Sequence, residues 1–497
     1  MLVRPLIPVR SVFDTDPFAK FHKYWARKPL EIVSHYLESY SKEGELILDP
    51  FMGSGTTLYA SMLSNRNSIG YDLNPTACFL VETLSKKSMT VADFDAAINE
   101  VNRRIGLKIN ALYSYDDKTI LWRSMHKNSD GLYKAQVSDN DFTNKASCAI
   151  KQNDESLTRP TFLATEFPPL LKDRFTSKGI RKVGDMFTTR NLIALELLQE
   201  SISQLDSPTK ENLMICLNNS ILHVSKLKGE GIRPLGVNSY WIPNDSIEEN
   251  LWWRFLERTQ NYRKSLAALN NMMGKQEFMP PTIINESSLS MTGLDNSSID
   301  YIFTDPPYGE TIQYSELSFI WNTFLNKEYQ VLEELVVNSV QGKSADSYLK
   351  LASSSLEECF RVLKSGKHMT IAFQSKDIRL WVGLSVILAE LGFELVEIEI
   401  AAPKGNPFTA NWSTKSPKND FYITVRKPKA KPKNRRTMTS VTWIDYKNNQ
   451  LNGEISSKMM KPQEIFQQIV GNIFELPFLG TALIDIPKNA LSKILEA

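Results

Sequence analysis

The chain has 497 residues, of which 42% are hydrophobic and 23% are charged, and its formal net charge is +2. This length exceeds what one core supports, so we expect two or three domains with the composition of an ordinary globular protein. No run of about eighteen apolar residues occurs, so we expect no helical membrane span. We also expect no secretion signal, because the first residues contain no long apolar stretch. The balanced charge means that any contact with phosphate must come from local clusters of Lys and Arg.

The four cysteines indicate the compartment and exclude two kinds of scaffold. Cys78, Cys148, Cys216 and Cys359 lie far apart and form no CxxC pair. The sequence therefore predicts neither a zinc ribbon nor a disulfide framework, and no metal site. We expect a reducing cytoplasm as the location.

Residues 20–85 are expected to fold as helix, strand, turn, helix and strand. The apolar run at 46–48 leads into the turn that contains Gly53 and Gly55, and a helix should begin near Thr56. Glycine allows unusual backbone angles and close approach of a ligand. Asp72 follows the next strand, where a carboxylate can accept hydrogen bonds from both ribose hydroxyls. The order predicts a doubly wound α/β sheet that holds an adenosine-type cofactor.

Each part of this motif has a plainer interpretation. The glycines can serve an ordinary tight turn, and Asp72 can cap a helix. The pattern does not read GxGxxG, which disfavours a nicotinamide enzyme.

The rest of the chain divides into three further stretches. Residues 86–280 form a mostly polar insertion, with helical patches at 192–198 and 251–256 and a loop-like tract at about 128–158. Residues 281–427 return to alternating strands and helices. Strands are predicted there at 282–284, 299–303, 369–373, 395–400 and 421–425. A basic, proline-interrupted linker at 426–436 precedes a small C-terminal domain at 437–497.

A second motif, DPPY, follows the strand predicted at 299–303. The strand must stop at Asp305, because Pro306 and Pro307 cannot continue it. The resulting stiff turn carries a carboxylate and the aromatic ring of Tyr308 at its tip. A purely structural Pro-Pro turn is the alternative.

The segments DPFMGSGTT at 49–57 and DPPY at 305–308 together resemble the motifs of amino-directed DNA methyltransferases, which act on adenine N6 or cytosine N4. The segment HKYWARKP at 22–29 is similar to the other cofactor segment of that family. The order of the segments matches the group whose target-recognition region lies between the two motifs. The resemblance implies a Rossmann-like methyltransferase sheet interrupted by the insertion at 86–280.

The resemblance also implies S-adenosyl-L-methionine as the cofactor. The residues assigned to it are Tyr24, Lys28, Pro29, Asp49, Pro50, Phe51, Gly53, Gly55, Thr56, Thr57, Asp72, Asn74 and Glu286. Glu286 is placed near the adenine, with Asn285 as its competitor. The cation and aromatic rings at 22–29 suit a carboxylate and a sulfonium. An aromatic-rich surface loop is the alternative there.

The catalytic residues implied by the resemblance are Asp305, Pro306, Pro307 and Tyr308. Transfer requires an acceptor that holds the NH2 group and directs its lone pair toward the sulfonium methyl. The Asp305 carboxylate and the Pro306 carbonyl can accept those N–H bonds, and Tyr308 can stack on a base rotated out of the duplex. The DPPY form favours adenine N6 over cytosine N4.

Segments at 184–191, 233–235 and 304–318 further resemble the larger adenine-specific methylases that carry a zinc ribbon, although the cysteine pairs of that ribbon are absent here. Double-stranded DNA is the expected partner, and a membrane is not. The C-terminal domain is a candidate docking surface for a protein. An RNA base methyltransferase, and a modification subunit of a restriction or defence system that depends on partners, remain alternatives.

Several smaller features have two interpretations. Arg174, Lys178, Arg181 and Lys182, with Phe175 among them, suit either a phosphate backbone or a solvated helix face. The stretch at 404–412 suits either a base-contacting loop or a β-turn. Tyr314 is expected to line a base pocket, whereas Trp252 and Trp321 are expected to pack in the core.

Overall fold

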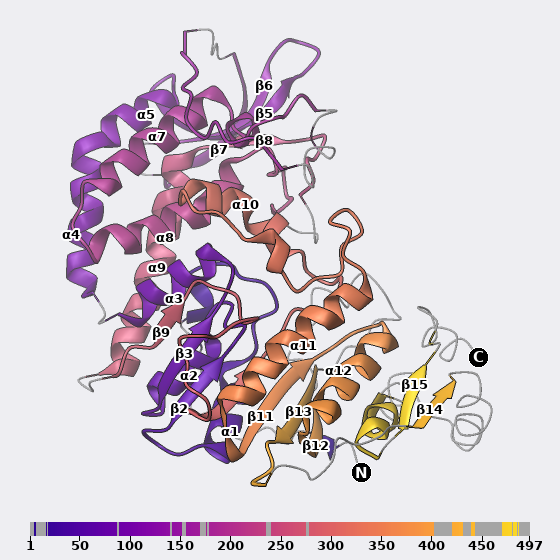
Figure 1. The fold of residues 1–497 in the computed structure, drawn as a ribbon. Coiled ribbons are helices and arrows are strands. Elements are labelled where there is room, and N and C mark those ends of the chain that lie inside the picture. The colour runs from indigo at the N-terminus through magenta and orange to yellow at the C-terminus, as the bar shows by residue number, and fades with distance from the viewer. Residues whose placement is uncertain are drawn as a thin grey trace.

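The structure is a computed structural model. It describes residues 4–5, 16, 18–86, 89–139, 142–151, 156–168, 175, 178–234, 240–274, 278–401, 420–430, 439–442, 470–479, 481–484 and 486. It contains an eight-stranded mixed sheet, a large insertion of helices and short strands beyond one end of that sheet, and a small element near the C-terminus (Figure 1). Among the described residues, no helix combines the length and apolar character that a membrane span requires.

The main sheet has the doubly wound character that the motifs predict. Its strands, in spatial order, are β1 (Arg4–Pro5), β12 (Glu394–Ala401), β13 (Asp420–Arg426), β11 (Leu363–Phe373), β10 (Ile299–Thr304), β2 (Leu46–Asp49), β3 (Asn67–Tyr71) and β9 (Thr282–Ile284). β13 runs antiparallel to β11 and β12, and the other neighbouring strands pair in parallel. The strands expected at 282–284, 299–303, 369–373, 395–400 and 421–425 are all present within these elements.

The strand order reverses between β2 and β10. From β2 the chain continues to β3 on one side, whereas from β10 it continues to β11 on the other. The register pairs Ile47 with Tyr301 and Leu48 with Ile302. The carboxyl ends of β2 and β10 therefore meet at one edge, which is the place where doubly wound sheets bind ligands.

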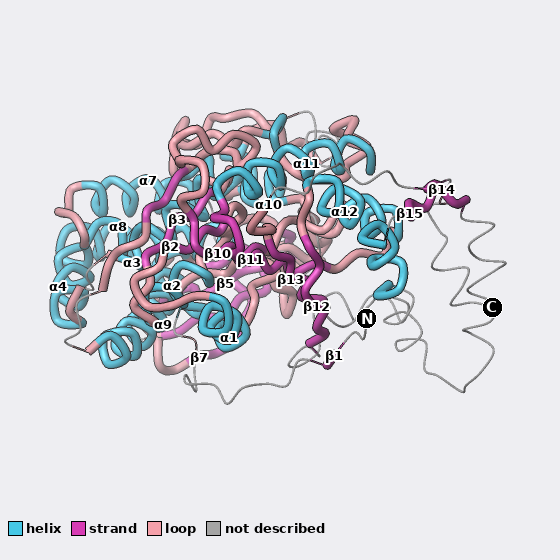
Figure 2. The backbone as a smooth tube through the Cα atoms, turned by 60° about the horizontal axis from the view of Figure 1, so that its bottom comes forward, coloured by secondary structure: helices cyan, strands magenta, loops and turns pink. Residues whose placement is uncertain are grey.

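Helices cover both faces of the sheet, and alternate strand residues supply the two cores. Ile47 and Tyr301 face α1 (Leu30–Tyr40), α2 (Thr56–Leu63) and α3 (Pro75–Ser85). Leu48 and Ile302 face α11 (Ala345–Val362) and α12 (Ile378–Leu391) on the opposite side, as Figure 2 shows. Burial on both faces explains why β10 is a continuous buried run and not an alternating one.

The insertion combines helices with a small antiparallel sheet. Its helices are α4 (Val91–Val101), α5 (Leu107–Leu112), α7 (Thr189–Ser203), α8 (Thr209–Ile221) and α9 (Leu251–Met273). Its strands are β4 (Ser114–Tyr115), β5 (Lys118–Lys127), β6 (Tyr133–Ser138), β7 (Lys145–Ile150) and β8 (Ile247–Glu249). The loop-like tract expected at 128–158 is therefore wrong, since it contains β6 and β7. Their small and polar residues show little apolar alternation, and pairing with a neighbouring strand defines them: β6 pairs with β5, and β7 pairs with β6.

The insertion is fastened to the sheet domain through α10 (Tyr314–Phe324), the helix that follows the DPPY turn. Asn218 of α8 donates from Nδ2 to the Trp321 carbonyl at 3.3 Å. The Tyr240 hydroxyl donates to the Leu317 carbonyl at 2.7 Å. Trp321 and Trp252 are both buried, as expected for core residues.

Near the C-terminus, β14 (Thr439–Thr442) pairs in parallel with β15 (Thr481–Ile484). The short helical turn Leu476–Leu479 packs on α12, and the ring of Phe474 lies 6.3 Å from that of Trp381 (Figure 1). The stretch at 404–412, the linker beyond residue 430, Arg174 and most of the domain at 437–497 lie outside the described residues.

We expect Gly55→Ala to destabilise the sheet domain more than Gly44→Ala does. Both glycines have a left-handed backbone, with φ of +83° and +77° respectively. A Cβ at Gly55 would lie 2.6 Å from Cγ2 of Val81 in α3, whereas one at Gly44 would meet no atom of the described residues within 4 Å. Backbone strain costs about 1–2 kcal/mol in both variants, and the clash adds roughly 1–3 kcal/mol at Gly55.

Urea unfolding of the two variants measures this difference. Equal midpoints would contradict the packing of Gly55 against α3.

Candidate active site

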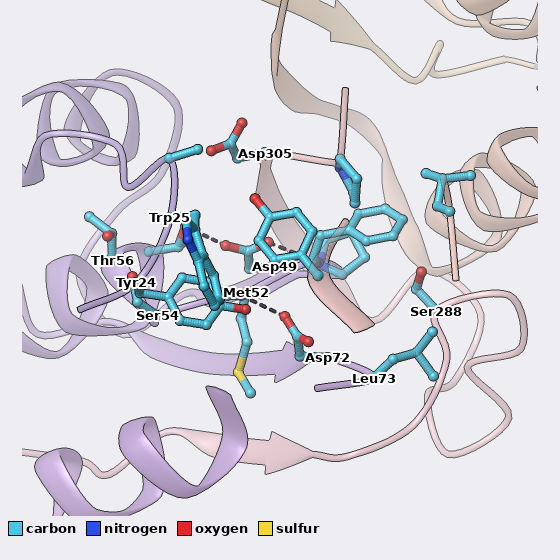
Figure 3. A pocket seen from close by; sticks show the side chains of 18 of the residues that line it. Tyr24, Trp25, Asp49, Met52, Ser54, Thr56, Asp72, Leu73, Ser288 and Asp305 are labelled. Atoms are coloured by element: carbon cyan, nitrogen blue, oxygen red, sulfur yellow. Dashed lines mark hydrogen bonds between the residues drawn. The ribbon is translucent and has the colours of Figure 1, made fainter. Parts of the chain in front are cut away.

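One cavity opens where β2, β3 and β10 end, and the two sequence motifs meet in it (Figure 3). Twelve residues assigned from the sequence line it: Tyr24, Lys28, Asp49, Pro50, Phe51, Gly53, Thr56, Thr57, Asp72, Glu286, Asp305 and Pro307. Tertiary structure thus joins segments separated by more than two hundred residues into a single site.

Asp49, at the end of β2, holds the Gly-containing turn. Its carboxylate accepts hydrogen bonds from the Thr57 hydroxyl at 2.6 Å and from the Phe51 backbone N–H at 3.1 Å. Burial raises the pKa of Asp49 to about 7, and the negative charges of Asp305 and Asp72 act in the same direction, against those two hydrogen bonds.

Asp72 links the same turn to the start of α3. Its two carboxylate oxygens accept from the backbone N–H groups of Gly53 at 2.8 Å and Asn74 at 2.7 Å. Burial raises the pKa of Asp72 to about 6. Each oxygen keeps a lone pair on the cavity side, so a ligand hydroxyl can still bind there.

Asn74 and Gly55 act behind the cavity wall. Asn74 caps α3 by accepting from the Thr76 backbone N–H at 3.2 Å, and its amide donates to the Tyr24 hydroxyl at 3.4 Å. Gly55 lacks a side chain because α3 packs against it. Pro29 is likewise removed from the cavity and caps the beginning of α1.

The DPPY turn presents Asp305 to the cavity and directs its other residues elsewhere. The Tyr308 hydroxyl donates to Oδ1 of Asp305, while the Tyr308 ring packs edge-on against Phe373 with centroids 5.6 Å apart. Pro307 lines the cavity and its carbonyl accepts from the Tyr348 hydroxyl at 2.6 Å. Pro306 lines a neighbouring apolar cavity behind the turn.

This packing bears on the stacking role that the sequence suggests for Tyr308. The ring lies behind the cavity wall and is 9% exposed, so its face is covered in this structure. The hydroxyl, and not the ring, connects Tyr308 with the Asp305 carboxylate.

Aromatic rings form the opposite wall of the cavity. Tyr24 and Tyr314 stack with centroids 6.0 Å apart, and Trp25 lies 5.6 Å from Tyr24 and edge-on to Tyr314. Tyr329 completes the wall. Tyr314 was expected there, whereas Trp25 and Tyr329 were not selected from the sequence. Trp25 lies within the recognised HKYWARKP segment, but the loop around Tyr329 has no motif.

The cavity is strongly acidic. Six carboxylates line it, those of Asp49, Asp72, Glu286, Asp305, Glu333 and Glu334, against the two basic side chains Arg27 and Lys28. Glu334 is buried and accepts from the Ser315 backbone N–H at 2.9 Å and from its hydroxyl at 2.6 Å. Burial raises the pKa of Glu334. Such a site favours a ligand that carries positive charge.

We expect Asp49→Asn to gain stability relative to the wild type as the pH rises. The folded pKa of Asp49 is raised to about 7, so the folded protein prefers the protonated acid. Ionisation then costs the wild type about 1.4 kcal/mol for each unit between about pH 4 and pH 7, and Asn has no proton to lose.

Thermal unfolding across that range measures the effect, with the exposed Asp130→Asn as the matched control. A stability difference that does not vary with pH would contradict the buried state of the Asp49 carboxyl.

Comparison with known proteins agrees with the motifs. The DNA methylase family model matches residues 11–83. The chain is 39% identical over 66 residues to the Type II methyltransferase M.MjaII of Methanocaldococcus jannaschii, covering 13% of this chain and 12% of that protein. It is 47% identical over 49 residues to M.HindIII of Haemophilus influenzae, covering 10% and 16%.

A longer alignment, 22% identical over 321 residues, joins the chain to the Type II methyltransferase M.MvaI of Kocuria varians and covers 61% of this chain and 57% of that protein. Among solved structures, the rRNA methyltransferase AviRa from Streptomyces viridochromogenes aligns over 84% of this chain and 94% of that chain, at 11% identity and a TM-score of 0.30. The chain spans less than a quarter of M.MjaII and M.HindIII. Residues 11–83, which include the HKYWARKP segment and the Gly-containing turn, therefore resemble the DNA methylase family.

Proposed function

We propose that this protein transfers a methyl group from S-adenosyl-L-methionine to the exocyclic amino group of a base in double-stranded DNA, with adenine N6 as the acceptor. One observation carries the proposal. Asp305 of the DPPY turn opens into the same cavity as Asp72 and the Gly-containing turn. A cofactor site and a carboxylate suited to an amine therefore lie next to each other.

The charge of the cavity and the positions of its hydrogen-bond acceptors suit the cofactor. S-adenosyl-L-methionine carries a sulfonium, and the acidic lining and the rings of Tyr24 and Trp25 suit a cation. Asp72 can accept from the ribose hydroxyls, since its oxygens are held by two backbone N–H groups. Glu286 lines the cavity beyond β9, and the family resemblance places it near the adenine.

The chemistry asks the protein mainly for positioning. When bound, the cofactor supplies an electrophilic methyl group. The Asp305 carboxylate would accept an N–H of the target amine and so direct the nitrogen lone pair toward that methyl. As the new N–C bond forms, the amine loses a proton, and the Asp305 carboxylate in the cavity wall would accept it. Burial raises the pKa of Asp305 to about 6, which suits a group that takes up a proton and releases it near neutral pH.

The insertion is proposed to recognise the target sequence. Lys178, Arg181 and Lys182 lie exposed on it and can contact phosphate. The hydrogen bonds from Asn218 and Tyr240 fasten the insertion to α10, whose Tyr314 lines the cavity. A DNA duplex bound by the insertion would then be held in a fixed relation to Asp305. A protein partner of the C-terminal domain remains a separate proposal.

We expect Asp305→Asn to lower methyl transfer by a factor of about 10² or more, because Asn presents an NH2 group to the target NH2. The affinity for the cofactor should change little, since Asp305 acts on the amine. Asp72→Asn should do the reverse and weaken cofactor binding by about 1–3 kcal/mol.

The rate is measured by transfer of a labelled methyl group to duplex DNA, and the cofactor affinity by calorimetry. Digestion of the product DNA identifies the methylated base. Full activity of a folded Asp305→Asn variant would contradict the proposed role of Asp305. Absence of cofactor binding to the wild type would contradict the proposed function as a whole, and N4-methylcytosine would reassign the acceptor.

We expect the affinity for S-adenosyl-L-methionine to rise with pH up to about pH 7. The pKa values of Asp49 and Asp72 are raised to about 7 and about 6, so these two groups are protonated in mild acid. A cationic ligand binds best when they are ionised, and each coupled proton changes affinity up to about tenfold per pH unit.

Calorimetry across this range, with S-adenosylhomocysteine as the matched ligand without the sulfonium charge, checks the expectation. The preference for the sulfonium form should grow as the pH rises. Equal pH profiles for the two ligands would show that the carboxylates do not respond to the sulfonium.

A further inference from the structure

Lys28 joins the DPPY turn to a distant strand. Its Nζ lies 3.5 Å from Oδ1 of Asp305 and 3.1 Å from Oδ2 of Asp420, the first residue of β13. The same ammonium lies 5.0 Å from the centroid of the Tyr308 ring. The three charged groups come from the segment before α1, the turn after β10 and the antiparallel strand of the sheet.

The side chain of Lys28 is only 6% exposed, so its charge must be balanced within the protein. Burial by itself lowers the pKa of Lys28, but the charges of Asp305 and Asp420 outweigh it and hold that pKa above its ordinary value. Lys28 is therefore a charged ammonium shared between two carboxylates.

The two carboxylate oxygens of Asp305 differ in the number of donors that contact them. The Lys28 ammonium and the Tyr308 hydroxyl both lie on Oδ1. Among the described residues, no hydrogen bond reaches Oδ2. Two donors on one oxygen fix the rotation of the carboxylate and leave the other oxygen to accept from a ligand.

We propose that Lys28 is a positioning residue for Asp305: it fixes Oδ1, keeps the carboxylate ionised and so presents Oδ2 to the cavity, while Asp420 holds Lys28 in place and moderates its effect. The role of Oδ2 as acceptor for the target amine rests on the proposed function. The effect of Lys28 on the orientation and pKa of Asp305 does not depend on the proposed function.

The charges around Asp305 predict opposite effects for its two neighbours. The titratable groups that face it are Lys28 before α1, Tyr308 on its own turn, Asp420 and Tyr422 on β13, Asp49 on β2, and Tyr314 on α10. Lys28 is the one cation among these described groups. Loss of Lys28 should therefore raise the pKa of Asp305 further, whereas loss of the Asp420 charge should lower it.

The test is a direct titration of the Asp305 carboxyl by NMR in protein labelled at the aspartate carboxyl carbon, with the signal assigned by its loss in Asp305→Asn. We expect Lys28→Met to raise the pKa of Asp305 by about one unit or more, and Asp420→Asn to lower it. Lys28→Arg, which keeps the charge, should leave it near the wild-type value. Exposed Lys108→Met is the control and should change neither the titration nor the rate.

The acid limb of kcat/KM for methyl transfer should follow the same order. It should move to higher pH in Lys28→Met and to lower pH in Asp420→Asn. At about pH 8, where Asp305 is ionised in the wild type, Lys28→Met should still lose about tenfold in kcat, because the carboxylate loses one of the two donors that fix its rotation.

The proposal would be overturned if the pKa of Asp305 shifted in the same direction in Lys28→Met and Asp420→Asn, or did not shift in Lys28→Met. Side chains that only fill space do not shift this pKa in opposite directions. Should Lys28→Met fail to fold by thermal melting, Lys28→Gln and Asp420→Asn carry the same comparison. Opposite shifts in a protein that methylates no DNA would uphold the hold of Lys28 on Asp305 and contradict the proposed function.

Discussion

The site depends on the parallel pairing of β2 with β10 at the point where the strand order reverses. This pairing brings the ends of two strands, more than two hundred residues apart in the chain, to one edge of the sheet. That register brings Asp49 and Asp305 to the same edge, because Asp49 is the last residue of β2 and Asp305 directly follows the last residue of β10. The Gly-containing turn and the DPPY turn would otherwise be two unrelated loops. Ligand sites in doubly wound sheets arise at this place because the two connections diverge and leave a crevice.

The pairing has an electrostatic cost. It gathers carboxylates at one buried edge, and burial raises the pKa values of Asp49, Asp72 and Asp305 together. The protein offsets part of this cost with backbone N–H donors at Asp72 and with the ammonium of Lys28 at Asp305. The repulsion between carboxylates that these donors leave uncompensated is relieved when a cationic ligand binds. A site of this kind trades stability of the empty protein for affinity.

The insertion is part of the same arrangement and not a separate appendage. Its α8 and its Tyr240 bind the backbone of α10, and α10 carries Tyr314 into the cavity wall. His22, at the beginning of the HKYWARKP segment, lies with Nε2 3.0 Å from Oδ1 of Asn218. A displacement of the insertion would thus reach both the aromatic wall and the segment that contains Lys28.

The sequence by itself determined the features that local backbone chemistry dictates. Two prolines must end β10 after Thr304, and the glycines of the 49–57 segment allow the left-handed angles that Gly53 and Gly55 adopt, so both turns and the strands before them were predicted correctly. Tertiary structure alone decided the rest. Asp420 and Tyr329 belong to no motif and reach the site through strand and loop packing. The strands β6 and β7 form because β6 pairs with β5 and β7 pairs with β6. The packing of the Tyr308 ring against Phe373, away from the cavity, was likewise not predictable from the sequence, because a turn fixes where a side chain begins but the surrounding core fixes which way it faces.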